Sequence, residues 1–341
     1  STLMRSSAAS DVYKRQCQDR LIEEVLKVQP NVVVVLHNGS PVELPWADKV
    51  SAILEMYLGG QGVGEACDRL LYGEANPSGR LAETFPYRLE DNPSYLHFPG
   101  NGKRVLYGED IFVGYRYYDT KKVPVRYAFG HGLSYTEFAY GDLNLSSAQM
   151  TDEDILTVSF KVKNTGKTEG KEVVQLYVAD MCGISERPVK ELKGFAKVHL
   201  LPGEEKTVSM EISARDLSYY EERLGDWYAP SGTYRILIGH ASDDVRLHAD
   251  IIFETQKELP LCVDFTTTFG ELLDHTKTAP VITELLAPLA AAAASAEGMS
   301  DEYKKLGEQV IREMPLKFLL GQMPGEQVEQ LIGQLNCLLA Q

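Results

Sequence analysis

The first strongly patterned stretch of the chain, RLIEEVLKVQPNVVVVLHNG, joins a helical repeat to an uninterrupted apolar run. Apolar residues between Leu21 and Leu26 recur at the three- and four-residue spacing of one helix face, and Pro30 ends that pattern. Residues 32–36 are apolar throughout, which is typical of a parallel strand covered on both faces. The pattern therefore predicts a helix that leads into a buried strand.

The same kinds of element continue to about residue 119. Residues 52–58 predict a second strand, which a glycine pair interrupts, and residues 63–72 predict a helix with one apolar side. Strand, crossover, strand and helix is the order found in an open, doubly wound α/β sheet. Ligands of such sheets bind beyond the carboxyl ends of the strands, here the loops 37–41 and 59–62.

The hydrophobic period changes to two between about residues 152 and 254. Apolar and polar residues alternate from Leu156 to Val162, and the alternation recurs around Leu176, Met210 and Ile236. Asn-Thr-Gly, Pro-Gly and Ser-Gly turn signals separate these runs. Short alternating strands with such turns predict a β-sandwich of the immunoglobulin or fibronectin type.

The last part of the chain returns to helical spacing. Residues 280–296, 301–314 and 326–339 are helix candidates, separated by glycine and proline. The alanine run 290–294 raises helix propensity but offers little surface to bury. We therefore expect residues 257–341 to form a helical tail rather than a domain with its own core.

The composition of the chain argues against several classes of function. The net charge of −15 over 341 residues disfavours nucleic-acid binding, and no apolar run reaches the length of a membrane span. The five cysteines lie far apart and show no zinc-like spacing, so we expect no metal site, no cofactor, free thiols and a cytoplasmic location. These cysteines are Cys17, Cys67, Cys182, Cys262 and Cys337.

The glycine-rich stretch GGQGVGEA, residues 59–66, precedes a predicted helix and has part of the spacing of a nucleotide-binding loop. No Lys-Ser or Lys-Thr pair follows it, so it is not a P-loop. A structural turn before a helix is the better interpretation.

The ionisable residues form no recognisable catalytic set. Glu109 and Asp110 are adjacent in what we expect to be an extended segment, so their side chains would point to opposite faces and could not flank one bond. His37, His97 and His131 have no serine or cysteine in a nucleophile setting nearby. We expect all five residues to have structural or surface roles.

Several motifs closely resemble those of glycoside hydrolase family 3, the β-glucosidase family. The stretch NVVVVLHNGSPVELPWADKVSAILEMYLGGQGVGEACDRLLYGEANPSGRLAETFP resembles the second domain of that family, as do YGEDIFVGYRYYD and YAFGHGLSYTEFAY. The stretches VKNTGKTEGKEVVQLYVAD and WYAPSGTYRILIGHASDDVRL resemble its fibronectin type III-like domain. The resemblance covers residues 17 to about 254, and the motifs occur in the family's order.

The resemblance implies a retaining mechanism that needs two carboxylates about 5 Å apart. In the family an aspartate of a (β/α)8 barrel attacks the sugar, and a glutamate on a loop of the α/β sandwich protonates the leaving oxygen. A barrel takes about 250 residues, which this sequence does not supply. The Gly-Glu-Gly-like loop is also absent, and Glu23 and Glu24 lie within the first predicted helix. We therefore assign no catalytic residue, and the substrate-binding residues remain unknown.

We thus expect residues 17–145 to be a partial α/β sandwich, residues 152–256 the fibronectin-like domain, and residues 257–341 the helical tail. The expected function is the C-terminal portion of a retaining β-glucosidase-type hydrolase, inactive alone, whose full-length parent acts on a β-linked glucoside or oligosaccharide. A homo-oligomer is compatible with this interpretation. The alternatives are a stand-alone carbohydrate-binding or scaffolding module and a nucleotide-binding α/β enzyme, which rests only on the glycine loop.

The opening stretch SSAASDVYKRQ, residues 6–16, has a different character from the rest. It lacks the apolar core of a signal peptide, and its letters resemble the translation of a transposase adaptor used to prepare sequencing libraries. We interpret residues 1–16 as a non-native leader. This interpretation places the native N-terminus, with any signal peptide, outside the sequence.

Deletion of residues 1–16 should therefore leave the melting temperature unchanged. The stretch 6–16 has only four apolar residues, too few to offset the entropy lost on ordering it. Thermal unfolding of the full and shortened chains measures this directly. A loss of several degrees would show that the leader belongs to the fold.

Overall fold

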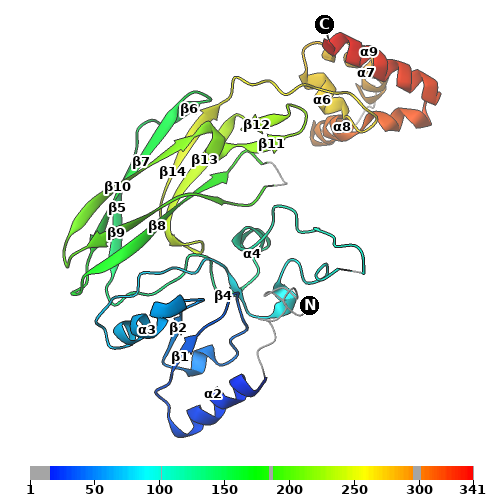
Figure 1. Ribbon diagram of the computed structural model, residues 1–341. Coiled ribbons are helices and arrows are strands. Elements are labelled where there is room, and N and C mark those ends of the chain that lie inside the picture. The colour runs from blue at the N-terminus through cyan, green and yellow to red at the C-terminus, as the bar shows by residue number, and fades with distance from the viewer. Residues whose placement is uncertain (1–15, 101, 184–186, 295–300, 341) are drawn as a thin grey trace. The chain divides into compact units, whose positions relative to one another are not determined.

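A computed structural model describes residues 16–100, 102–183, 187–294 and 301–340, and the chain divides into two compact units (Figure 1). The first unit extends to Tyr220 and includes Trp227–Gln256, and the second comprises Glu221–Asp226 and Lys257–Gln341. The expected leader, residues 1–16, lies outside the described residues except for Gln16.

The α/β part of the first unit follows the predicted order of elements. It contains α2 (Gln16–Val28), β1 (Val33–Leu36), β2 (Ala52–Glu55) and α3 (Val63–Leu71). The strands β1 and β2 pair in parallel, as expected, with Val33 opposite Ala52. The partial α/β architecture inferred from the sequence is confirmed.

The expected burial of β1 on both faces is wrong. Val33 is 48% exposed, and the other residues of β1 are only half-buried. The physical reason is that, within the described part of the chain, β1 and β2 form a sheet of only two strands. The apolar run therefore has less structure over it than a central strand of a large sheet would have.

A small core lies beside these strands. The buried side chains are Val42, Leu44, Trp46 and Phe85, and the indole nitrogen of Trp46 donates a 2.7 Å hydrogen bond to Asp19 of α2. This bond satisfies the one polar atom of a side chain that is otherwise buried in apolar surroundings. The short strands and helices around this core are η1 (Ala47–Lys49), η2 (Gly60–Gly62), β3 (Phe85–Pro86), η3 (Leu89–Asp91), α4 (Tyr115–Lys121) and β4 (Val125–Tyr127).

The sandwich has a sheet in the order β10-β7-β5 and a five-stranded sheet in the order β6-β14-β13-β8-β9 (Figure 1). These orders hold for the described residues. The strand bounds are β5 (Phe138–Leu145), β6 (Gln149–Thr151), β7 (Ile155–Asn164), β8 (Gly170–Asp180), β9 (Glu191–Leu200), β10 (Glu205–Ser213), β13 (Gly232–Ala241) and β14 (Asp244–Glu254). The turn α5 (Ala214–Leu217) follows β10, and β11 (Tyr219–Glu221) pairs with β12 (Asp226–Tyr228).

The two-residue alternation predicted for the sandwich is confirmed in β7, but it is wrong around Leu176 in β8, where residues 174–179 are all buried. Along β7 the buried positions are Leu156, Val158, Phe160 and Val162, each separated from the next by a more exposed residue. These side chains form one core with the inward residues of the five-stranded sheet. The alternation in β7 is that of a sandwich strand, with one face turned to the core between the two sheets.

The start of the sandwich differs from the expected residue 152. Strand β5 pairs antiparallel with β7, from Phe138 opposite Asn164 to Leu145 opposite Val158. Its residues 138–145 therefore belong to the sandwich rather than to the α/β part. The sequence FAYGDLNL contains a glycine and an aspartate that weaken its strand pattern, and the structure has a register shift there.

The second unit contains more helices than the sequence predicted. The three expected helices are present as α7 (Ala279–Ala294), α8 (Asp301–Glu313) and α9 (Gly325–Ala340). Two short ones were missed, α6 (Phe269–Asp274) and η4 (Leu316–Gly321). Thr268 and Glu271 form a capping box at the start of α6, in which each side chain satisfies a backbone N–H group of the other residue.

The expectation that the second unit lacks a core is wrong. Its fully buried side chains include Phe269 and Leu272 from α6, Ile282 from α7, and Leu335 from α9. The short helices that the sequence pattern did not reveal contribute much of this core. The remaining buried members are Val263, Leu286, Leu316, Leu319 and Val328. The unit therefore has the hydrophobic interior of a small helical domain.

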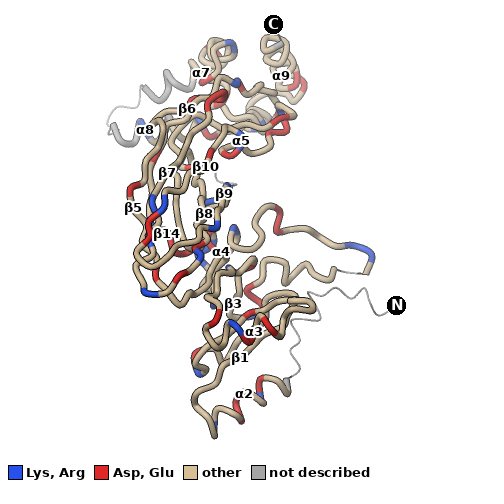
Figure 2. The backbone as a smooth tube through the Cα atoms, turned by 60° about the vertical axis from the view of Figure 1, so that its left-hand side comes forward, with Lys and Arg blue, Asp and Glu red and all other residues tan. Residues whose placement is uncertain are grey.

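Charged residues of both signs are mixed along the sandwich strands (Figure 2). Of the helices in the described ranges, none has both the length and the apolar character that crossing a membrane requires.

The separate cores predict separate effects on unfolding. Leu335→Ala removes a fully buried side chain and should destabilise the second unit by about 2–5 kcal/mol without changing the first. Leu320→Ala in the same unit is the control, because Leu320 is 48% exposed. Calorimetry of the full chain should show the shift in one transition only. An equal shift in every transition would contradict this independence.

Candidate functional site

A pocket of 740 Å³ is lined in part by the loop that follows β1. Its walls come from stretches that are distant in sequence, so only the folded chain brings them together. Four continuous stretches line the pocket, together with several isolated residues. These stretches are 39–43, 82–84, 92–94 and 113–116. A cleft beyond the end of a parallel strand is the expected position for a ligand in an α/β fold.

Two of these stretches are fixed by backbone hydrogen bonds. The stretch 82–84 follows Leu81, whose N–H donates to the carbonyl of His131, and Gly130 donates back to Leu81 at 2.8 Å. The stretch 113–116 turns into α4 at Gly114, whose φ of +56° is accessible to glycine at little cost. The backbone therefore contributes to the position of both walls.

The acidic residues of the pocket have different environments. Glu43 accepts a 2.7 Å hydrogen bond from the N–H group of Leu89 and so links two walls. Glu109 also lines the pocket, and its buried Oε2 has no hydrogen-bond partner within the described part of the chain. An unpaired buried carboxylate oxygen is costly, so Glu109 is the residue with the strongest physical need for a hydrogen-bond donor.

A second acidic group lies at the end of β2. Glu55 accepts a hydrogen bond from the N–H group of Tyr57 at 2.8 Å, and burial raises the pKa of Glu55. Burial, together with the charge of Glu55, raises the pKa of Tyr57 to about 12. Tyr57 adopts a left-handed backbone conformation with φ of +47°, which is strained for a tyrosine. The end of β2 thus combines a neutral phenol with a partly desolvated carboxyl group.

The aromatic wall of the pocket is held by the sandwich. The ring of Tyr115 stacks on Phe129 with centroids 4.8 Å apart and packs edge-on against Tyr177 of β8. The N–H group of Leu192 in β9 donates a 2.7 Å hydrogen bond to the Tyr115 hydroxyl oxygen. These contacts tie one side of the pocket to strands about 50 to 80 residues further along the chain.

Arg116 extends the same wall and pairs with Glu191 of β9 at 3.4 Å. Burial alone would raise the pKa of Glu191, but the cations of Lys193, Arg116 and Arg187 outweigh it and lower that pKa. The guanidinium of Arg116 is therefore partly neutralised by an ionised carboxylate.

The arrangement is suited to binding hydroxyl groups. Carboxylate oxygens can accept hydrogen bonds from them, and the aromatic rings provide apolar surface beside these acceptors. Within the described residues, no group of three or more His, Cys, Asp or Glu side chains could hold a metal ion.

The sequence located this site only in part. Of the two loops expected to bind a ligand, residues 39–41 of the first line the pocket, whereas none of residues 59–62 does. The latter form a structural turn in which Gly60 has φ of +67°. The aromatic wall was missed, although the aromatic-rich motifs GYRYYD and YAFGHG contain it.

The expected extended conformation at Glu109 and Asp110 is wrong. Both residues lie in a turn, and Asp110 has φ of +49°. The glycine on each side of this stretch, at positions 108 and 114, favours a turn over a strand. The turn directs the two residues to different environments, since Glu109 is half-buried at the pocket and Asp110 is exposed.

The histidines lie in separate places. His37 is exposed, whereas His131 stacks on Tyr127 with ring centroids 5.1 Å apart, and burial lowers the pKa of His131. His97 packs against Gly108, where an added Cβ atom would lie 2.7 Å from the imidazole Nε2. All five cysteines are free thiols, as expected.

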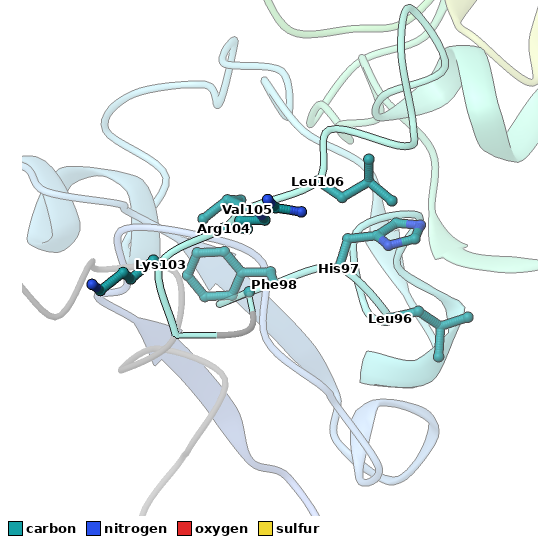
Figure 3. Close-up of a pocket in the computed structure, with 8 residues that line it drawn as sticks. Leu96, His97, Phe98, Lys103, Arg104, Val105 and Leu106 are labelled. Atoms are coloured by element: carbon teal, nitrogen blue, oxygen red, sulfur yellow. The ribbon is translucent and has the colours of Figure 1, made fainter.

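A second pocket, of 630 Å³, is lined by residues of one loop: 96–98, Gly100 and 103–106 (Figure 3). The loop carries His97, Phe98, Lys103 and Arg104, but many of its apolar side chains are exposed, and Leu96 is 86% exposed. We call the following residues the apolar loop surface: Tyr95, Leu96, Phe98, Val105, Leu106, Tyr107, Ile111 and Val113. Exposed apolar side chains gathered in one segment make the apolar loop surface a candidate interaction surface.

Comparison with known proteins identifies both parts of the first unit. Residues 6–135 match the profile described as "Glycosyl hydrolase family 3 C-terminal domain", and residues 172–242 match "Fibronectin type III-like domain".

Curated relatives are much longer than this chain. "Thermostable beta-glucosidase B" of Acetivibrio thermocellus is 46% identical over 323 residues, which are 94% of this chain and 42% of the relative. "Beta-glucosidase" of Kluyveromyces marxianus is 45% identical over 251 residues, 73% of this chain and 29% of the relative. The chain therefore spans less than half of the length of these relatives.

Solved structures give the same result. The Kluyveromyces marxianus β-glucosidase in complex with glucose matches with a TM-score of 0.67 and 41% identity, covering 72% of this chain and 29% of that one. The family 3 β-glucosidase of Bifidobacterium adolescentis matches with a TM-score of 0.71 and 39% identity, covering 78% and 39%. From both profiles and these similarities, the chain belongs to glycoside hydrolase family 3 and contains its C-terminal and fibronectin type III-like domains.

Proposed function

We propose that this chain is the C-terminal part of a retaining β-glucosidase and forms one wall of its substrate site. The observation that carries the proposal is the 46% identity to a β-glucosidase over 94% of the chain. The pocket supports it, because acidic residues beside aromatic rings suit a sugar. We propose a β-linked glucoside or oligosaccharide as the substrate of the whole enzyme and a cytoplasmic location.

The chemistry itself needs groups from elsewhere in such an enzyme. Retaining hydrolysis requires a nucleophile and an acid/base carboxyl group about 5 Å apart. We assign neither role to Glu43 or Glu109, because Glu43 is engaged by the Leu89 N–H group and Glu109 lies in a turn of the wall. The chain's part is to shape and close the site.

The apolar loop surface supports the proposal that the catalytic groups come from another part of the enzyme. Leu96, Leu106 and Tyr107 are among its most exposed members. In a monomer, exposed apolar surface of this extent favours aggregation or association. We propose that the part of the enzyme present in the relatives but not spanned by this chain covers it.

The domain organisation that we propose has an α/β part to about residue 137, a sandwich to residue 256 and a helical domain from residue 257. The proposed sandwich begins at β5 because β5 pairs with β7. The helical domain has no assigned role.

This chain alone should hydrolyse no nitrophenyl β-glucoside, whereas a longer gene product that contains it should do so. The reason is that loss of either carboxylate of a retaining pair abolishes most turnover. Release of nitrophenol by both proteins, at equal concentration, measures the difference. Glu109→Gln in the isolated chain is the control for adventitious activity.

Two results would contradict the proposal. Turnover by the isolated chain that Glu109→Gln abolishes would show that the chain carries its own catalytic carboxylate. A longer gene product with no activity on any β-glycoside would remove the β-glucosidase assignment.

A further inference from the structure

Two residues that line the 740 Å³ pocket each have a buried polar atom with no hydrogen-bond partner in the described part of the chain. These atoms are Oγ1 of Thr84 and Oε2 of Glu109. Thr84 is only 5% exposed, so solvent contributes little to satisfying its hydroxyl group. A buried polar group without a partner lowers the stability of a fold, so two of them in one pocket indicate a ligand that supplies the missing hydrogen bonds.

The backbone holds both residues in place. Thr84 directly precedes β3, in which Phe85 lies opposite Tyr127 of β4. The carbonyl oxygen of Glu109 accepts a 2.9 Å hydrogen bond from the N–H group of Phe112, which closes the turn around Glu109. The two side chains therefore come from ordered backbone in separate stretches of the chain, as in a preformed ligand site.

The sandwich also fixes the stretch that carries Thr84. Arg80, in the same stretch, donates a 2.8 Å hydrogen bond to Glu172 of β8, whose side chain is 0% exposed. The hydroxyl group of Tyr140 donates a second hydrogen bond to Glu172, at 2.8 Å, and Nδ1 of His240 lies 2.7 Å from Glu172. Loss of these contacts would leave a buried carboxyl group short of partners, which opposes movement of this wall. A wall that is already held in place loses little entropy when a ligand binds.

The two unpartnered atoms call for hydroxyl groups. A carboxyl oxygen of Glu109 accepts hydrogen bonds, and the hydroxyl group of Thr84 can donate one as well as accept. The hydroxyl groups of a ligand can do both, so a polyhydroxylated ligand suits the two residues with one kind of group. The rings of Tyr115, Tyr118 and Phe129 add apolar surface to the pocket, against which the C–H groups of a sugar ring can pack.

The charged residues that line the pocket favour a neutral ligand. They comprise three glutamates, Glu43, Glu83 and Glu109, and one arginine, Arg116. The arginine is already paired with Glu191 at 3.4 Å. A phosphate or carboxylate group on a ligand would therefore meet mainly acidic side chains and a cation that is engaged elsewhere.

We propose that Thr84 and Glu109 bind hydroxyl groups of one neutral sugar in this pocket, and that the chain binds such a sugar by itself. The inference deepens the proposed function and rests on it for the choice of a sugar as the ligand. It adds the two binding residues and the exclusion of phosphorylated and acidic sugars. Both residues act in binding and stand outside the catalytic pair.

The first test separates a role in binding from a role in folding. Valine has the shape of threonine without its hydroxyl group, so Thr84→Val should be at least as stable as the wild type, while its affinity for glucose falls about fivefold. Thr136→Val is the matched control, because the buried Thr136 hydroxyl donates a 2.6 Å hydrogen bond to Asn164. This control should lose stability and keep its affinity for glucose.

Thermal unfolding measures the stability of these variants, and NMR titration of the full chain with glucose measures affinity. Glucose should bind with a Kd roughly in the millimolar range and shift the amide resonances of residues 82–84 and 113–116, but not those of residues 103–106 at the second pocket. Glu109→Gln should weaken binding about tenfold. Glu90→Gln, at an exposed glutamate outside the pocket, should leave it unchanged.

Charged sugars test the preference for a neutral ligand. Glucose 6-phosphate should bind about tenfold more weakly than glucose. Tighter binding of glucose 6-phosphate, or of glucosamine with its ammonium group, would overturn the assignment to a neutral sugar.

Other results would overturn the site itself. These are a loss of stability in Thr84→Val, no shift of the pocket amides by glucose, or glucose binding that neither Thr84→Val nor Glu109→Gln weakens. If Glu109→Gln does not fold, the wild-type titration and Thr84→Val decide the question.

Failure of this inference is distinguishable from failure of the proposed function. A longer gene product that hydrolyses nitrophenyl glucoside, together with an isolated chain that binds no glucose, would remove the binding site and leave the β-glucosidase assignment standing. Glucose binding through Thr84 and Glu109, with no hydrolysis by the longer gene product, would do the reverse.

Discussion

The cost of burying the Glu172 carboxylate is the constraint on which the first unit depends. A single carboxylate with no solvent exposure is stable only if several donors surround it, and no single element of the chain supplies them all. Arg80 must come from the α/β part, while Tyr140 and His240 come from two strands of the sandwich. The sandwich is therefore not structurally independent of the α/β part, because Arg80 of the α/β part is needed to pair its buried carboxylate.

The sandwich also holds the aromatic wall of the pocket. Tyr115 and Arg116 are held by Leu192 and Glu191 in addition to the contacts at Glu172. Elsewhere in the α/β part, β1 has one neighbouring strand among the described residues, and the residues of the apolar loop surface are exposed. Our proposal that groups outside this chain complete the site and cover this surface rests on that exposure.

The elements that sequence predicted well are those whose signal is local. The alternation along β7 and the helical spacing in α2, α3 and α9 each depend on residues within one element, so the period alone reveals them. The parallel pairing of β1 and β2 followed from the order of elements. The family could be identified for the same reason, because its motifs are contiguous stretches of sequence.

The predictions that were wrong or missing concern features with no local sequence signal. The helix α6 has six residues and η4 is equally short, too short for a periodic signal, yet Phe269, Leu272 and Leu316 from these segments are fully buried. The extent to which β1 is covered depends on its neighbours rather than on its own residues. The turn at Glu109 was also missed, because the glycines that favour it lie at its edges.

The pocket was the hardest feature to predict because its residues meet only in the folded chain. Tyr115 and Leu192 are 77 residues apart, and Arg80 and Glu172 are 92 apart. Neither pair has a spacing that a motif could reveal. His240 shows the limit most clearly: in sequence it is one histidine in a predicted strand, and only the folded chain shows that its ring lies between the Glu172 carboxylate and the carbonyl oxygen of Gly132. The chemistry of such a residue belongs to its contacts, and those contacts follow from the burial of Glu172.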